Sequence, residues 1–206
     1  MRFRILILLT IVTALPLAAQ NVDDRYWQFH AGIGWPAAVG STQSSANGLM
    51  HTMFGAIRRV SPRLGIRFDG EYDAFNPSDK ILTSYGAHEG RAQVYSLSAD
   101  LQLKMMDIGW GQAYFLGGVG SHYKHAFIQN PSTGVVCDPF WGICYGVGTD
   151  IIIGTQTDTG YGANAGVGYE MPLTSDSQLF FELKYQWINT KTGGAQFVPF
   201  TIGARF

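Results

Sequence analysis

The chain has 206 residues, of which 14% are charged and 26 are glycine, and its formal net charge is -1. An average soluble domain is about 25% charged, so this chain is poor in charge, and its high apolar content excludes intrinsic disorder. The near-neutral charge without a basic segment argues against a nucleic-acid binder, and two cysteines are too few for a disulfide-rich miniprotein.

The first nineteen residues have the pattern of a secretory signal peptide. Arg2 and Arg4 precede an apolar run of 15 residues from Ile5 to Ala19. A helix needs about 20 residues to span a bilayer, so an uncleaved helical anchor is the less favoured alternative. We expect cleavage after Ala19, which leaves a signal peptide at 1–19 and one mature domain at 20–206.

The mature chain alternates with a period of two, which is typical of strands with two different faces. In seven segments one face is apolar and uncharged, and the other carries the charged residues and most of the strand glycines. These segments are 27–35, 66–74, 95–105, 115–123, 161–171, 179–187 and 198–206. A register shift of one residue would exchange the two faces, so the pattern specifies which face points where.

An eighth strand is expected between the first two segments, at about 47–60, where the alternation is less regular. Its apolar residues also fit a helical stripe: Leu49, Met50, Met53, Phe54, Ile57 and Val60. We favour a strand because the sequence Ser61-Pro62-Arg63 predicts a tight turn into the next strand. A β-bulge would explain the irregular alternation.

The predicted connections alternate in length along the chain. Short turns are expected at 60–64, 106–111 and 172–177, longer loops at 38–46, 76–90 and 127–158, and a last hairpin of intermediate length at 189–195. With eight strands in up-and-down order, all the longer loops lie at one end, and the short turns and both termini lie at the other. This asymmetry is typical of bacterial outer-membrane barrels, whose short turns are periplasmic.

The alternation does not say whether the apolar face points to lipid or to a core, so a soluble lipocalin-like barrel is the main alternative. Glycines on the polar face suit the narrow interior of a small barrel. Trp27 and Trp35 lie on one face of one strand. Their separation along the membrane normal is roughly 20 Å, close to the ~25 Å apolar band between aromatic girdles. We therefore predict an all-β, eight-stranded antiparallel up-and-down transmembrane β-barrel with both termini periplasmic.

The last strand, 197–206, alternates apolar residues and ends in Phe206. With the Gly-x-Gly steps at 118–120 and 166–168, the mature chain resembles the small eight-stranded outer-membrane β-barrel family that includes the OmpA transmembrane domain and OmpX. The resemblance implies that Phe206 belongs to the insertion signal read by the barrel assembly machinery. We expect a monomer in contact with outer-membrane lipid.

Ten charged residues on the second face would point into the barrel. They are Arg67, Asp69, Glu71, Asp73, Asp100, Lys104, Glu170, Glu182, Lys184 and Arg205. An isolated buried charge costs several kcal/mol, so we expect these residues to form a polar network. Eight strands leave little open space, which favours a largely plugged lumen and a structural or interaction role. The alternative is a narrow pore that is weakly cation-selective because the acids are in excess.

Cys137 and Cys144 flank six residues in the longest predicted loop. An exported protein meets an oxidising compartment, so we expect a disulfide between them. It would present Phe140 and Trp141 at the loop tip. Protection of the loop is the favoured interpretation, and the alternative is an adhesin-like binding tip for an extracellular ligand.

We expect no catalysis, cofactor or metal. Some small barrels that resemble this chain deacylate lipid with an outward-facing Ser and His. Ser121 and His125 share the apolar face, but four residues along a strand separate them by roughly 13 Å, which is too far for a nucleophile and its base. The five histidines show no metal-ligand spacing on one face.

Overall fold

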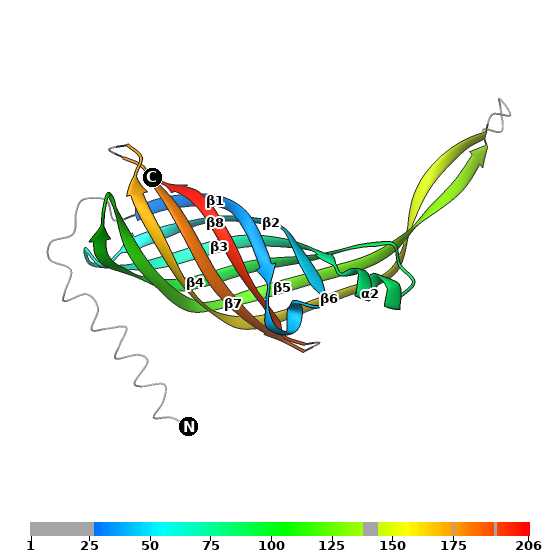
Figure 1. Ribbon diagram of the computed structural model, residues 1–206, viewed down its shortest axis with the longest axis horizontal. Helices are drawn as coiled ribbons and strands as arrows, with labels where there is room; N and C mark the ends of the chain where they lie inside the picture. Colours follow the sequence, from blue (N-terminus) through cyan, green and yellow to red (C-terminus); the bar gives the residue numbers. More distant parts are fainter. Residues whose placement is uncertain (1–26, 138–143, 175, 192) are drawn as a thin grey trace, which may run out of the picture.

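The computed structural model describes residues 27–137, 144–174, 176–191 and 193–206. Within these residues, eight strands form a closed barrel in which each strand pairs antiparallel with its neighbours in sequence and β1 pairs with β8 (Figure 1). The strands are β1 (Trp27–Ala38), β2 (Ala46–Arg59), β3 (Leu64–Pro77), β4 (Glu89–Ile108), β5 (Gly111–Cys137), β6 (Cys144–Pro172), β7 (Gln178–Thr190) and β8 (Ala195–Arg205). The predicted fold class is confirmed, whereas the predicted signal peptide at 1–19 lies outside the described residues.

The outer wall of the barrel is apolar and its interior is polar. Ile33, Phe54 and Leu97 project outward with 70%, 71% and 70% of their surfaces exposed, while residues of opposite parity, such as His30 and Asp100, are buried. A soluble barrel has the reverse arrangement, with its apolar side chains inside. The distribution therefore supports the lipid-facing interpretation of the apolar face over the lipocalin-like one.

A break in register explains the irregular sequence pattern of strand β2. Its pairing with β3 shifts between Gly48 and Met50, which is the signature of a β-bulge. The extra residue changes the parity of the strand, so its apolar positions no longer alternate from end to end. The helical alternative for this segment is wrong, and the strand interpretation is correct.

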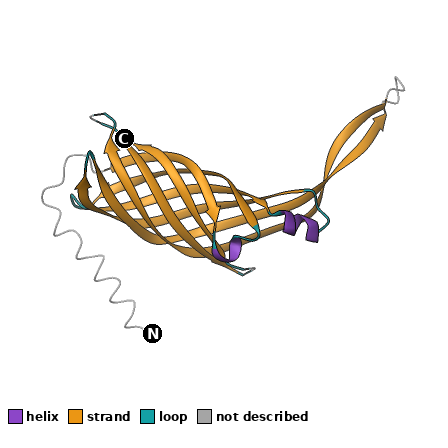
Figure 2. Ribbon diagram, viewed as in Figure 1, coloured by secondary structure: helices purple, strands orange, loops and turns teal. Residues whose placement is uncertain are grey.

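The two ends of the barrel differ (Figure 2). One end, called the turn end here, carries the connections at 60–63, 109–110 and 173–177 and the C-terminus. There the backbone of Phe206 exchanges two hydrogen bonds with Phe29, at 2.8 and 2.9 Å. The other end, the loop end, carries the 3₁₀-helix η2 (Gly40–Thr42) and the short helix α2 (Asp79–Ser84). No helix in the described part of the chain is long and apolar enough to cross a membrane.

The prediction of a long irregular loop at 127–158 is wrong. Strands β5 and β6 remain paired from the barrel to Cys137 and Cys144, and this hairpin projects far beyond the loop end (Figure 1). The segment 147–157 is rich in Val, Ile and Thr, which favour strands. Beyond Gln129, β5 pairs only with β6, and proline and glycine are compatible with such an edge position. The turn-forming composition was therefore a weaker signal than the β-branched residues.

Candidate functional site

The ten charged residues predicted for the lumen all lie on the inner face of the barrel and are buried. They are Arg67, Asp69, Glu71 and Asp73 on β3, Asp100 and Lys104 on β4, Glu170 on β6, Glu182 and Lys184 on β7, and Arg205 on β8. This placement follows from strand parity, because every residue in the set stands at an inward position of its strand. The barrel interior is the candidate functional site.

Arg67 is the centre of this interior. Its guanidinium donates to both carboxylate oxygens of Glu182, at 2.5 and 3.1 Å, and its Nε contacts Asp69 at 2.7 Å. Tyr114 donates to Glu182 Oε2 at 2.8 Å. Since β3 and β7 stand four strands apart in a closed barrel of eight, the paired bonds between Arg67 and Glu182 cross the interior.

Lys184 forms a second centre nearer the loop end. Its ammonium pairs with Glu71, lies 3.3 Å from Asp69 Oδ2 and lies 3.6 Å from Asp100 Oδ2. Gln186, two residues further along β7, donates to the other oxygen of Glu71. Lys184 therefore compensates acids on β3 and on β4.

A third group of charges lies toward the turn end. Glu170 forms ion pairs with both Lys104 and Arg205 and so joins β4, β6 and β8. The guanidinium of Arg205 also lies 5.6 Å from the ring centres of Tyr114 and Phe180, within the range of cation–π attraction.

Sequence reasoning did not assign the histidine partners of this network. The pairs are His30 Nε2 with Asp69 at 2.8 Å, His51 Nδ1 with Asp73 at 2.7 Å, and His122 Nδ1 with Ser96 at 2.8 Å. The parity of His30 and His122 was a usable signal, because both stand on the charged face of regular strands. The parity of His51 could not be read, because it follows the bulge in β2.

Glycines on the inner face make room for these large side chains. A Cβ atom at Gly168 would overlap the ring of Tyr114, and a Cβ atom at Gly203 would overlap the ring of Phe180. Both aromatic side chains are buried. Tyr114 and Phe180 are the direct register partners of Gly168 and Gly203 on neighbouring strands. The enrichment of glycine on the charged face therefore reflects the room that large side chains of the adjacent strand need in a narrow interior.

A layer of apolar side chains covers the polar network at the loop end. Phe75, Val94, Ile188 and Phe197 form one buried cluster, and the rings of Phe75 and Phe197 meet edge to face at 5.3 Å. These residues stand at inward positions, where the sequence otherwise places polar groups. This layer was not predicted, although the change from charged to apolar inward positions near the strand ends was a signal for it.

Other predicted residues lie away from the lumen. Cys137 and Cys144 form the last register pair of the hairpin, where the structure describes the backbone. Phe140 and Trp141 lie outside the described residues. The disulfide between Cys137 and Cys144 and the binding tip therefore stay predictions.

Ser121 is exposed on the outer wall, and His125, four residues along the same strand, packs its ring against Phe127 at 5.9 Å. Within the described residues, no three His, Cys, Asp or Glu side chains are placed to hold a metal ion.

No protein-family model matches the chain, and no curated protein sequence matches it. Among solved structures, the chain is similar to a major outer membrane protein from Thermus thermophilus, with a TM-score of 0.56 and 13% identity over 87% of this chain and 97% of that chain. It is also similar to Neisserial surface protein A, with a TM-score of 0.51 and 18% identity over 87% of this chain and 95% of that chain. At these identities the likeness shows the fold, which is that of the small eight-stranded outer-membrane β-barrels.

Proposed function

Since its fold is that of the small outer-membrane barrels, we propose that this chain is an integral protein of a bacterial outer membrane with a structural or interaction role and a plugged lumen. The observation that carries the proposal is the distribution of side chains. Apolar residues cover the outer wall, and paired charges fill the inside. In such a barrel, closure of the sheet gives every strand's backbone N–H and C=O groups hydrogen-bond partners, and the charged side chains pair with one another inside. A lipid environment requires both.

Aromatic side chains support the same placement. Trp27 and Phe206 are exposed near the turn end, and Trp35, Tyr123 and Trp187 are exposed nearer the loop end. Membrane barrels carry such residues in girdles at the two lipid–water interfaces. We infer that the turn end with both termini faces the periplasm, that the barrel assembly machinery reads Phe206 during insertion, and that the barrel is a monomer.

Two other functions have a specific observation in their favour. Among its buried residues the described interior holds six Asp or Glu and four Lys or Arg side chains, and this excess of acid supports a narrow, weakly cation-selective pore. The projecting hairpin supports an adhesin-like binder, because the paired strands β5 and β6 extend beyond the rest of the loop end (Figure 1). A disulfide at its last described pair would stiffen the hairpin.

A catalytic role has little support, and we infer that the chain is not an enzyme and takes no cofactor. Ser96 and His122 lie at hydrogen-bond distance, but both are buried inside the barrel wall. A nucleophile and base need access to substrate as well as contact with each other.

Quenching of tryptophan fluorescence by brominated lipid tests the proposal. Residues 20–206 are refolded into phosphatidylcholine vesicles with bromine on the acyl chains, and unbrominated vesicles are the control. We expect strong quenching, because Trp27, Trp35 and Trp187 project from the outer wall. A chain that folds as a monomer in buffer without lipid or detergent would contradict the proposal.

A further inference from the structure

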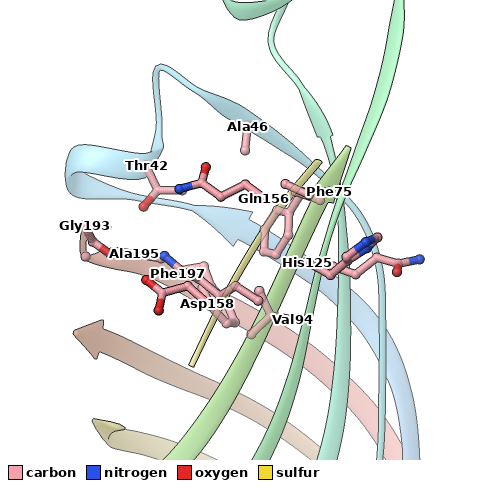
Figure 3. Close-up of a pocket in the computed structure, with 15 residues that line it drawn as sticks. Thr42, Ala46, Phe75, Val94, His125, Gln156, Asp158, Gly193, Ala195 and Phe197 are labelled. Atoms are coloured by element: carbon pink, nitrogen blue, oxygen red, sulfur yellow. Dashed lines mark hydrogen bonds between the residues drawn. The ribbon is translucent and has the colours of Figure 1, made fainter. Parts of the chain in front are cut away.

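A cavity lies on the outer side of the apolar layer, at the mouth of the barrel (Figure 3). It measures about 230 Å³, and Phe75 and Phe197 form part of its lining. Lys124, Gln156 and Asp158 supply polar groups to the same cavity. We call it the mouth cavity. Its mixed lining of apolar and polar side chains contrasts with the ion-paired lumen on the other side of the layer.

A second cavity of about 450 Å³ lies beside it, beneath helix α2. Ile81 of α2 and the adjoining Tyr85 line it from one side, and Phe127 and Ile128 of β5 line it from the other. We call it the roof cavity. Ile128 stands at an inward position of β5 at the rim of the barrel, where it pairs with Gly90 of β4 and Gly154 of β6, so the base of the hairpin forms one wall.

The two cavities are neighbours and share lining residues. Ala46, Ala92 and Ala126 line both, together with Gln156. Three of the four shared residues are alanine, whose methyl groups occupy little of the space between the two cavities. Together the two volumes fall within the ~300–1,000 Å³ typical of small-molecule sites.

Hydrogen bonds hold helix α2 and the residues that flank it in place over the roof cavity from two sides. Ser78, which precedes α2, donates from its hydroxyl to the carbonyl of Ser44 at 2.9 Å. Asn130 of the hairpin donates to the carbonyl of Gly86 at 2.9 Å and accepts from the backbone N–H of His88 at 2.8 Å. These bonds fix the segment after α2 to β5. A cavity held in this way is pre-organised, which lowers the entropic cost of binding.

The polar groups of the mouth cavity include charges of both signs close together. Lys124 stands directly opposite Asp158 across the pairing of β5 and β6, and its ammonium donates to the carbonyl of Gly193 at 3.0 Å. A charged ligand would therefore meet one attractive and one repulsive group. A neutral polar head can accept from the ammonium and from the amide of Gln156 and donate to the carboxylate without that penalty.

We propose that the mouth and roof cavities form one binding site for a neutral amphiphile with an unbranched alkyl tail, with the tail beneath α2 and the head beside Lys124 and Gln156. The tail side is lined by Ile81, Tyr85 and Ile128, and the head side carries the polar groups. The polar, ion-paired lumen beyond the apolar layer excludes such a tail, so the ligand stays at the loop end. This site goes beyond the proposed structural role and does not depend on it.

A titration with 1-decanol tests the site. The protein is placed in phospholipid nanodiscs with carbon-13 in the methyl groups of isoleucine and alanine. We expect saturable chemical-shift changes at Ile81, Ala92 and Ala126, which line the cavities. The lipid-facing methyl groups of Ile33 and Ile202 report simple partition into the membrane. Changes at Ile81 that follow those of Ile33 without saturation would overturn the proposal.

A matched pair of variants on one strand distinguishes binding at the proposed site from binding to the outer wall. Ala92→Phe fills the junction of the two cavities, and we expect it to weaken decanol binding about tenfold or more, since the loss of room for even one methylene has effects of that order. Ala99→Phe makes the same change on the lipid-facing side of β4 and leaves binding unchanged. If Ala92→Phe does not fold, Ile81→Asp on the exposed helix provides the same test. Equal binding in Ala92→Phe or Ile81→Asp and the parent chain would contradict the site.

Charged homologues test the class of ligand. Decanoate and decyltrimethylammonium have related alkyl tails and opposite charges. We expect both to shift Ile81 and Ala126 with lower affinity than decanol. Tighter binding of either charged compound would overturn the assignment of a neutral head.

Discussion

Arg67 is completely buried, and its guanidinium contacts acids on its own strand and on the opposite wall. A buried ion pair is not by itself a source of stability, because desolvation opposes the attraction between the charges. The loss of one partner is different, since it leaves the other charge buried and uncompensated. The barrel is therefore expected to tolerate joint replacement of the pair better than single replacement.

Replacement of Arg67 tests this expectation. We predict that Arg67→Met lowers the free energy of unfolding by about 3 kcal/mol, because Glu182 then keeps its charge without its main partner. The double variant Arg67→Met, Glu182→Met should recover a large part of that loss. Urea unfolding in lipid vesicles measures the free energy of unfolding of the parent chain, of the single variants Arg67→Met and Glu182→Met, and of the double variant. The interpretation would be contradicted if the double variant lost as much free energy of unfolding as the two single variants lose when their losses are added, or more.

The two cysteines give a second prediction at this scale. Cys137 and Cys144 are direct register neighbours, and directly opposite residues of antiparallel strands have Cβ atoms about 4.5–5.5 Å apart, close to the reach of a disulfide. We predict that iodoacetamide modifies neither cysteine in protein isolated from an oxidising compartment, and modifies both after reduction. Mass spectrometry of the intact chain counts the added groups. Modification of both cysteines before reduction would show that the thiols are free.

The strands differ in how well their sequences predict their bounds and the direction in which their side chains point. Regular strands such as β4 and β7 show both faces in the sequence, because no bulge interrupts the alternation at 95–104 and 179–187. Strand β2 was predicted with an uncertain start, because its bulge after Gly48 changes the parity of the residues beyond it. The extension of β5 and β6 was not predicted, since a two-stranded ribbon outside the barrel need not have one buried face and so need not alternate.

Truncation of the hairpin tests whether the hairpin contributes to the stability of the barrel. Beyond Gln129 the extended part of β5 pairs with β6 alone. We predict that replacing residues 131–150 by an Asn-Gly turn changes the free energy of unfolding by less than about 0.5 kcal/mol. Heat-modifiable migration on a gel and urea unfolding report the result. Loss of folding after truncation would mean that the hairpin takes part in forming the barrel.

The barrel wall as a whole places charged side chains on its inner face and apolar side chains on its outer face. The side of the wall that each charged residue faces could be predicted from the sequence, because alternation is a local property of a strand. The partners could not be predicted, since Arg67 and Glu182 are 115 positions apart and meet only when the barrel closes. The apolar layer of Phe75 and Phe197 likewise depends on which strand ends come together, and so does the cavity outside it.

The plugged lumen is the central claim, and single-channel recording tests it most directly. Mature protein is refolded, its folding is checked by heat-modifiable migration, and it is inserted in planar bilayers beside the variants Asp73→Asn and Lys184→Ala. We predict a silent bilayer for the parent chain, because ion pairs cross the interior and an apolar layer covers it at the loop end. Discrete current steps in the parent chain, with an ion selectivity that changes in the two variants, would contradict the plugged lumen and establish the pore.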